Sequence, residues 1–337
     1  MDKIKLNQKQ MRAVGCLIGG AAGDALGYAV EFLSDERIFQ KYGERGITDY
    51  QRNNGVAEFS DDTQMTLFTA EGLLKATNMD SAQKSIHASY LNWYKTQSVN
   101  GPVAREGLLS ISNLYSNRAP GMTCLHALES RMCGSIECPI NTSKGCGGVM
   151  RVAPVAIYCH SRGISIDCAD TMGAEAAAIT HGHELGYIPA AMLVHILYRI
   201  LEGWGVPDAV SDALSKVPPM YPKSEHIGEA VELVEHAIAL AADDMDDLDA
   251  IRMLGEGWVA EQTLAIAVYC CLKYSDNFDS AIIASVNHSG DSDSTGAVTG
   301  NIIGAYLGAS RIPVKYIDRL ELIDTIVDMG MRLCEVK

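Results

Sequence analysis

Residues 15–27 read GCLIGGAAGDALG, and residues 296–308 read GAVTGNIIGAYLG. Both stretches carry glycine at every fourth position, first at 15, 19, 23 and 27, and again at 296, 300, 304 and 308. A glycine inside a helix costs about 1 kcal/mol relative to alanine. Four glycines on one helix face therefore imply that another backbone approaches that face closely. The pattern predicts two central helices, one near each end of the chain, packed tightly together.

Most of the remaining sequence has the apolar spacing of amphipathic helices. From Gln8 to Val30, apolar residues recur at intervals of three and four. The same spacing recurs in the segments 64–76, 171–180, 188–201, 226–242, 259–274 and 295–308. Strand-like alternation is nearly absent, and no low-complexity linker divides the chain. The sequence therefore predicts an all-α fold, a single compact multi-helix domain spanning residues 1–337.

Composition narrows the class of protein. The chain is 47% hydrophobic, and its formal net charge of −15 disfavours sequence-independent binding to nucleic acids. Its ten cysteines are scattered and form no CxxC pair, as expected of reduced, mostly buried thiols. The N-terminal segment is polar, and the longest uncharged stretch, Ser294–Ser310, is too short and polar to cross a bilayer comfortably. We expect a cytoplasmic protein without nucleic-acid or membrane partners.

Two short acidic clusters, FSDDTQM (59–65) and SGDSDSTG (289–296), read almost alike. Each combines two aspartates with hydroxyl side chains just before a helix-like stretch, and neither has a Lys or Arg nearby. Four carboxylates brought together would repel one another unless cations lay between them. Hard divalent metals such as Mg²⁺ and Mn²⁺ prefer this all-oxygen ligand set. The clusters predict a metal site assembled from both ends of the chain.

The alternative is that each cluster only caps a helix. Ser, Thr and Asp are preferred at helix N-termini, and acidic residues suit the positive end of the helix dipole. For one cluster alone, capping is the more economical interpretation. Two matching clusters favour metal binding, and the two roles are compatible because capping would hold the ligands rigid.

Six segments taken together resemble the ADP-ribosylglycohydrolase family, from about residue 12 to 310. The segments are GCLIGGAAGDALGYAVEF (15–32), FSDDTQMTL (59–67), GGVMRVAPVAIY (147–158), THGHELGY (180–187), GEGWVAEQTLAIAVYC (255–270) and NHSGDSDSTGAVTGNIIGAYLG (287–308). The resemblance implies a compact all-α domain with two Mg²⁺ or Mn²⁺ ions in a cleft. It also implies a metal-ligand set of Ser60, Asp61, Asp62, Asp291, Asp293 and Ser294.

The resemblance further assigns catalytic and substrate-binding residues. Glu31 matches the family's acidic residue beside the distal ribose, which guides water or transfers a proton; otherwise it is an ordinary glutamate at a helix end. His181 is placed in the substrate cleft. The glycine-rich substrate loop maps to Ser143, Gly145, Gly147, Gly148, Val149 and Met150. Many relatives have Asn where this chain has Cys146, which is not expected to act as a nucleophile.

For several other residues a structural role is the leading expectation. Asp24 is expected to be paired or hydrogen-bonded in its apolar segment, and Arg151 either to meet phosphates or to form an internal ion pair. His183 and His288 are expected to have structural roles, and Trp258 is expected to pack in the core. The alternative for Trp258 is that its loop lines the cleft.

The predicted function is a metal-dependent hydrolase that removes ADP-ribose from a modified protein side chain, with arginine as the leading acceptor. Its partners would be an ADP-ribosylated protein and the product ADP-ribose. Alternatives are a serine, threonine or small-guanidine linkage, an immunity role against an ADP-ribosylating toxin, and a non-catalytic ADP-ribose binder. A dinuclear phosphoesterase is disfavoured because it would more usually use histidine ligands.

Overall fold

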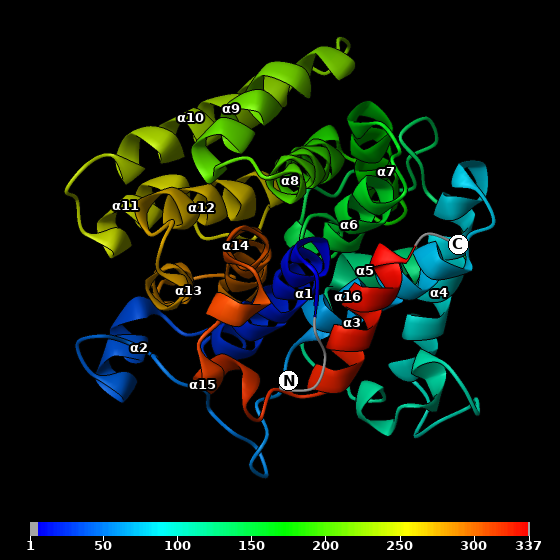
Figure 1. The fold of residues 1–337 in the computed structure, drawn as a ribbon, viewed down its shortest axis with the longest axis horizontal. Helices are drawn as coiled ribbons and strands as arrows, with labels where there is room; N and C mark the ends of the chain where they lie inside the picture. Colours follow the sequence, from blue (N-terminus) through cyan, green and yellow to red (C-terminus); the bar gives the residue numbers. More distant parts are fainter. Residues whose placement is uncertain (1–5, 336–337) are drawn as a thin grey trace.

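The two glycine-rich segments form helices α1 (Gln8–Gly27) and α14 (Ser292–Leu307), which lie side by side in the middle of the molecule (Figure 1). The structure is a computed structural model that describes residues 6–335. The two helices run in opposite directions, and a methyl group built on Gly19 would overlap the carbonyl oxygen of Gly300. The close glycine pairs are Gly15 with Gly304, Gly19 with Gly300, and Gly23 with Gly296.

The last glycine of each series departs from the expected pairing. Gly27 meets the backbone of Ser292 rather than a glycine. Gly308 has a φ of 77° and lies just beyond the last residue of α14, where it ends the helix. Its conformation is one that glycine adopts readily and other residues rarely do. The predicted tight helix pair is confirmed, but Gly308 serves as a helix stop.

The other predicted helices are present with bounds shifted by up to about five residues. They are α3 (Asp61–Lys75), α7 (Ile166–Ala178), α8 (Glu184–Glu202), α10 (Ile227–Ala241) and α12 (Ala260–Lys273). The sequence did not predict α2 (Asp35–Tyr42), α4 (Met79–Thr96), α5 (Met122–Glu129), α6 (Ala153–Ser161), α9 (Val206–Lys216), α11 (Asp247–Leu254), α13 (Phe278–Val286), α15 (Val314–Ile317) and α16 (Ile323–Cys334). Short 3₁₀ turns lie at 108–110, 112–114, 146–148, 218–220 and 309–311. Within residues 6–335 there is no β-strand, only isolated bridges, so the all-α prediction is confirmed.

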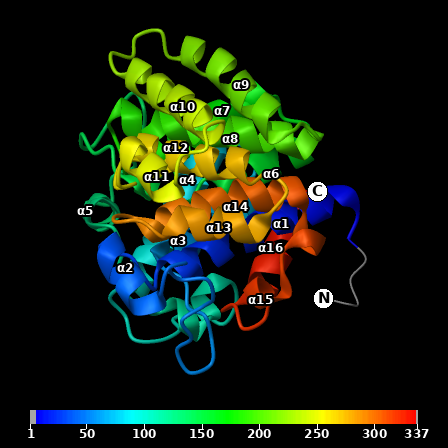
Figure 2. The ribbon, with the colours of Figure 1, turned by 90° about the vertical axis from the view of Figure 1, so that its left-hand side faces the viewer.

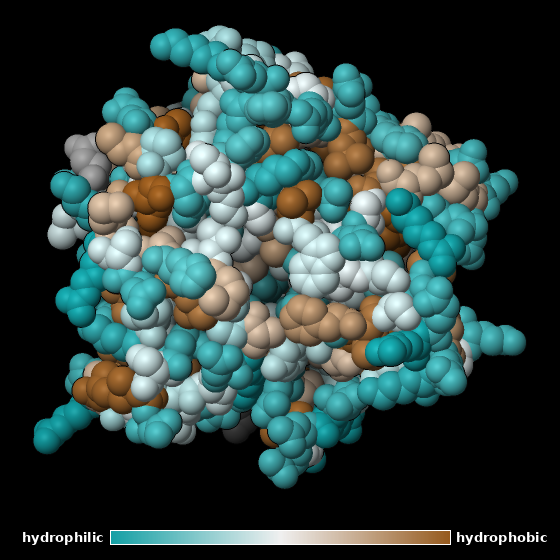
Figure 3. Space-filling view, turned by 180° about the vertical axis from the view of Figure 1, so that it is seen from behind, coloured by the Kyte–Doolittle hydropathy of each residue, from teal (hydrophilic) through white to brown (hydrophobic). Residues whose placement is uncertain are grey.

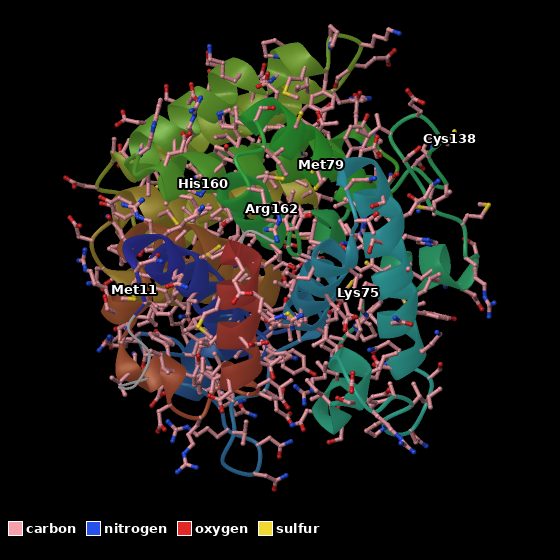
Figure 4. The ribbon with its side chains drawn as sticks, turned by 45° about the vertical axis from the view of Figure 1, so that its right-hand side comes forward. Met11, Lys75, Met79, Cys138, His160 and Arg162 are labelled. Atoms are coloured by element: carbon pink, nitrogen blue, oxygen red, sulfur yellow. The ribbon has the colours of Figure 1, made fainter. Side chains whose placement is uncertain are left out.

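The remaining helices surround the central pair. Figure 2 shows α9 and α10 at one end of the molecule, α2 and α15 at the other, and α1, α13 and α14 between them. Helix α16 packs against α1 and α6. Arg162, labelled in Figure 4, follows α6 and donates a hydrogen bond to the carbonyl of Leu333 in α16, at 2.9 Å. The C-terminal helix is thereby joined to the middle of the chain.

One helix is long and apolar enough to cross a membrane by length and composition. This is α8, and 83% of its apolar window is buried inside the structure, as in the core helix of a globular protein. The longest uncharged stretch of the sequence, Ser294–Ser310, corresponds to α14 and the turn after it.

Candidate metal centre and substrate cleft

The two acidic clusters lie at the start of two helices that meet in one cleft. Ser60 precedes α3 and accepts a hydrogen bond from the amide of Asp62 at 3.2 Å. Asp291 precedes α14 and accepts one from the amide of Ser294 at 3.3 Å. Both clusters therefore do cap helices, as the alternative interpretation held. Because α14 runs beside α1, the second cluster is brought to the side of the molecule where α3 begins.

Asp24, in the central helix α1, holds the first acidic cluster in place. Its carboxylate accepts hydrogen bonds from the amide of Ser60 at 2.8 Å and from the amide of Thr63 at 2.9 Å. Burial, followed by repulsion from Asp293, raises the pKa of Asp24 to about 7. The expected structural role of Asp24 is thus to fix the turn that carries Asp61 and Asp62.

The cleft has a volume of about 310 Å³, and acidic side chains form its floor. Figure 3 shows a hollow near the centre of the face opposite that of Figure 1. The sequence-predicted residues that line the cleft are Glu31, Asp61, Asp62, Gly145, Gly147, Met150, His181, Asp291, Asp293 and Ser294. The others, Ser60, Ser143, Gly148 and Val149, are not among the lining residues.

The four aspartates are almost completely buried, at 2–4% exposure. In the described part of the chain, none of them forms an ion pair with a Lys, Arg or His side chain. Burial and mutual repulsion raise the pKa values of Asp61, Asp62 and Asp293 well above the usual carboxylate range. Buried charges without partners are costly, so this arrangement fits a bound cation.

Glu31 adds a fifth carboxylate to the same group. Oxygen atoms of Glu31, Asp291 and Asp293 lie within 4.8 Å of one another. Oε2 of Glu31 and Oδ2 of Asp62 are buried and have no hydrogen-bond partner among the described residues. Burial and the nearby aspartates raise the pKa of Glu31 to about 11. An all-oxygen donor set with unpaired buried atoms is suited to hard divalent metals.

Cys146 lies between the glycines of the predicted substrate loop and lines the cleft. Its thiol donates a hydrogen bond to Oδ2 of Asp291, with the sulfur 2.7 Å from the oxygen. Burial, together with Asp291 and Asp62, raises the pKa of this thiol well above its usual range. A thiol that stays protonated is a poor nucleophile, which agrees with the expectation that Cys146 does not act as one.

His181 faces the substrate loop. The cavity-side ring nitrogen, Nε2, lies beside Gly145 and Gly147, and Nδ1 lies 2.9 Å from the hydroxyl of Thr180. Burial, followed by the charge of Arg151, lowers the pKa of His181 to about 3, so the ring is neutral.

Arg151 fits neither of its two expected roles. The guanidinium is fully buried behind the cleft, stacks on the ring of Tyr90 at 4.3 Å, and donates to Thr180 Oγ1 at 2.6 Å. It forms no ion pair within residues 6–335 and does not line the cleft.

His183 and His288, for which structural roles were expected, do have such contacts. His183 caps α8, and His288 contacts the backbone of Ser285.

Trp258 lines the cleft and is 39% exposed, so the expectation that it packs as core is wrong and the alternative, that its loop lines the cleft, is confirmed. The sequence did not indicate Phe32 and residues 119–124, which lead into α5 and line the cleft as well. The amide of Gly121 donates to Oδ2 of Asp61 at 3.2 Å, so this loop is fixed to the first acidic cluster. No spacing or composition signal in 119–124 marks that contact.

Named relatives cover nearly the full chain. The zebrafish (Danio rerio) ADP-ribosylhydrolase ARH3 is 25% identical, with 96% of this chain and 90% of that protein covered. The ADP-ribosyl-[dinitrogen reductase] glycohydrolase of Rhodospirillum rubrum is 25% identical, with 92% and 90% covered. The ADP-ribosylarginine hydrolase Tri1 of Pseudomonas putida is 26% identical, with 96% and 77% covered.

Comparison with solved structures supports the same fold. A chain of an ADP-ribosylglycohydrolase-related protein complex matches with a TM-score of 0.62 and 24% identity. That match covers 98% of this chain and 99% of the other. Residues 6–337 also match the family described as ADP-ribosylglycohydrolase. This protein therefore belongs to the ADP-ribosylglycohydrolase family.

Proposed function

We propose that this protein hydrolyses the bond between ADP-ribose and a modified arginine side chain, with two divalent cations, Mg²⁺ or Mn²⁺, as cofactors. The observation that carries the proposal is the group of four buried aspartates, which adjoin Glu31 in one cleft and have no cationic partner within residues 6–335. The relatives whose names specify a linkage, the Tri1 proteins, are ADP-ribosylarginine hydrolases. That naming supports arginine as the acceptor.

The proposed metal ligands are the two capping clusters. Asp61, Asp62, Asp291 and Asp293 supply the charge, and the hydroxyls of Ser60 and Ser294 complete the oxygen set. When bound, the cations would polarise the ribose hydroxyls and acidify a water molecule. The hydrogen bonds of Asp24 would keep the first cluster rigid, because three of them hold its turn at Ser60 and Thr63.

The substrate would lie across the cleft with its reacting sugar beside Glu31. Small residues at Gly145 and Gly147 leave room for the diphosphate, and backbone amides in such a turn can bind its oxygens. Behind this turn, Ser143 would keep the loop in place through its contacts with Thr123 at 3.1 Å and with the amide of Gly145 at 3.3 Å. The neutral ring of His181 would donate or accept a hydrogen bond near the ribose.

In the reaction, water adds to the anomeric carbon while the carbon–nitrogen bond to the guanidine breaks. The water oxygen stays on the ribose, and one proton passes to the leaving nitrogen. Glu31 is the group of this chain that can move this proton, since its Oε2 is buried and unpartnered. The transition state at such a carbon resembles an oxocarbenium ion, which the surrounding carboxylates stabilise.

The test is release of free ADP-ribose from an ADP-ribosylarginine protein with Mg²⁺ or Mn²⁺, and with EDTA. We expect metal-dependent release that is lost in the Asp61→Ala, Asp293→Ala double variant. An Asp208→Ala, Asp244→Ala variant is the matched control, because both of these aspartates are exposed and lie outside the cleft. Release that persists in EDTA, or in the first variant, would contradict the metal site.

Two alternatives have distinct outcomes in the same assay. Release from serine- or threonine-linked substrates alone would assign a different acceptor. Tight binding of ADP-ribose without release from any linkage would indicate a non-catalytic binder. The second alternative is disfavoured because all four cleft aspartates are present and are brought together.

A further inference from the structure

An exposed pair of aromatic rings lies at the wall of the cleft. The rings of Phe32 and Trp258 are stacked, with centroids 5.7 Å apart and planes 23° from parallel. Phe32 is 66% exposed and Trp258 is 39% exposed, and both residues line the cleft. Two large aromatic side chains that leave this much surface open beside a polar site are suited to contact a ligand.

The backbone holds both rings in place. Phe32 has a φ of 65°, in the left-handed region that a bulky residue adopts only at a local cost. The carbonyl of Trp258 accepts a hydrogen bond from the amide of Cys146 at 3.2 Å, which fixes its loop to the substrate turn. The carbonyl of the nearby Glu256 accepts one from the amide of Asp291 at 2.8 Å. The loop that carries Trp258 is therefore attached both to the substrate turn and to the second acidic cluster.

The position of the pair determines which part of a substrate it would meet. Phe32 directly follows Glu31, and Trp258 belongs to the loop that supports Asp291. In the proposed function the bond that breaks lies beside Glu31 and this floor. The group attached to the anomeric carbon, rather than the diphosphate, would thus lie against the two rings.

The side chains that line the cleft do not oppose a positively charged group at that position. Burial, followed by the charge of Arg151, lowers the pKa of His181, so its ring is neutral. Among the lining residues there is no Lys or Arg to repel a cation. A planar cation gains further by stacking on aromatic faces.

We propose that Phe32 and Trp258 form the acceptor subsite, in which the guanidinium of the ADP-ribosylated arginine stacks on the aromatic pair. The inference rests on the proposed function and specifies how that site distinguishes its substrates. A serine- or threonine-linked substrate presents only an uncharged ether oxygen and an aliphatic carbon there, so it gains little from the rings. The pair selects arginine through the charge and flat shape of the guanidinium.

The experiment compares two peptides that differ only in linkage, ADP-ribosylarginine and ADP-ribosylserine, with the Mg²⁺- or Mn²⁺-loaded protein. In the Trp258→Leu variant we expect kcat/KM for the arginine-linked peptide to fall about tenfold, equivalent to ~1.4 kcal/mol. The value for the serine-linked peptide and the Kd of free ADP-ribose should change by less than about twofold. Neither of these probes places a guanidinium on the rings.

Three further variants serve as controls. Trp258→Phe keeps an aromatic face and should recover most of the loss. Phe32→Asn removes the second ring with a residue that tolerates the left-handed backbone, and should act like Trp258→Leu. Trp204→Leu removes the other 39%-exposed tryptophan, which lies outside the cleft on Arg199, and should behave as wild type.

The outcomes separate this inference from the function on which it rests. Equal losses on both linkages, a weaker Kd for ADP-ribose, or no change in Trp258→Leu would overturn the subsite while leaving the hydrolase intact. A wild-type protein that releases nothing from the arginine-linked peptide would overturn the acceptor assignment itself, and the subsite with it.

Discussion

Asp24, in the central helix α1, accepts hydrogen bonds from both the amide and the hydroxyl of Thr63, at 2.9 and 2.5 Å. A third bond comes from the amide of Ser60 at 2.8 Å. The carboxylate is completely buried, so no water can replace these bonds. The geometry of the first acidic cluster thus depends on a residue that does not line the cleft.

Asp24→Asn should therefore weaken both the fold and the metal site. The side-chain NH2 group of the new asparagine would face a backbone N–H group of Ser60 or Thr63, so a donor meets a donor. An unsatisfied buried polar group costs about 1–3 kcal/mol. We expect the free energy of unfolding to fall by that amount and the affinity for Mn²⁺ to fall about tenfold, as for other residues that support metal ligands. Chemical denaturation and titration calorimetry measure the two effects.

Asp170→Asn is the matched control for this variant. Asp170 is also completely buried, but it bonds His195 outside the cleft. It should lower stability without changing Mn²⁺ affinity. Unchanged Mn²⁺ affinity in Asp24→Asn as well would mean that Asp24 supports only the fold.

Gly19→Ala tests the close contact between the two central helices. The new methyl group would overlap the carbonyl oxygen of Gly300, so the helices would have to separate. Overpacking of this kind typically costs about 1–3 kcal/mol, and here backbone rather than a flexible side chain must move. Thermal and chemical unfolding should both report a less stable protein.

Gly228→Ala should have the opposite effect on the stability of the protein. Gly228 lies in α10 and has no atom within 4 Å of the added methyl group. Because alanine is the better helix former, this variant should gain up to about 1 kcal/mol. Equal effects of the two substitutions would show that helix propensity, and not close packing, explains the glycine spacing.

Thr180→Val tests how the ring of His181 is oriented. Arg151 donates to Thr180 Oγ1 at 2.6 Å, which leaves the hydroxyl proton of Thr180 for Nδ1 of His181, 2.9 Å away. His181 then carries its proton on Nε2, the nitrogen that faces Gly145 and Gly147. Valine keeps the shape of threonine and removes the hydroxyl, so the ring loses the partner that fixes its tautomer.

The expected result is a Kd for ADP-ribose that rises about fivefold, in line with a lost hydrogen bond of ~1 kcal/mol. Nitrogen-15 NMR of the imidazole should show a shift from one tautomer to a mixture. Thr171→Val, at an exposed position where the hydroxyl bonds only the carbonyl of Asp167, should change neither readout. A wild-type tautomer in Thr180→Val would refute the assignment.

The sequence predicted those parts of the molecule that local patterns encode. Glycine spacing identified the α1–α14 pair because close backbone approach requires the same residue at each helical turn. The two similar acidic clusters predicted the acidic residues that line the cleft. Carboxylates brought together repel one another in any fold unless a cation lies between them. Two expectations stay predictions: the whole chain forms one domain, and the protein is cytoplasmic.

The walls of the cleft were less predictable because they depend on tertiary contacts. Phe32 lies in the cleft through a left-handed backbone that no pattern around it signals. Residues 119–124 reach the site because Gly121 bonds Asp61, a contact between segments sixty residues apart. Arg151, which follows the substrate loop directly, lies behind the cleft because Tyr90 and Thr180 hold its guanidinium there.

His195, outside the cleft, predicts a pH dependence of stability. It is completely buried between Asp170, 2.8 Å from Nδ1, and Asp212, 2.9 Å from Nε2, and Arg199 also contacts Asp212. Burial alone would lower the pKa of His195, but its hydrogen bonds to the two aspartates outweigh burial and raise the pKa above its usual value. The folded protein therefore binds this proton more tightly than the unfolded chain.

The sign of the effect follows from linkage. The stabilisation by His195 is fully present below the unfolded pKa of about 6.5 and is lost as the pH rises through the higher folded pKa. His195→Gln should cost about 3–5 kcal/mol at pH 6, since it breaks a buried charged network. The difference between wild type and variant should shrink as the pH rises to about 9.

Denaturant unfolding of both proteins across this pH range measures the difference in stability directly. The carboxyl groups of the cleft titrate in both proteins, so their contribution cancels in this difference. His236→Gln, at a half-buried position in α10, should differ little from wild type in stability. A difference for His195→Gln that stays constant from pH 6 to pH 9 would mean that His195 is not protonated in the folded protein. The two aspartates would then hold a neutral ring, and Asp170 would have to carry the shared proton.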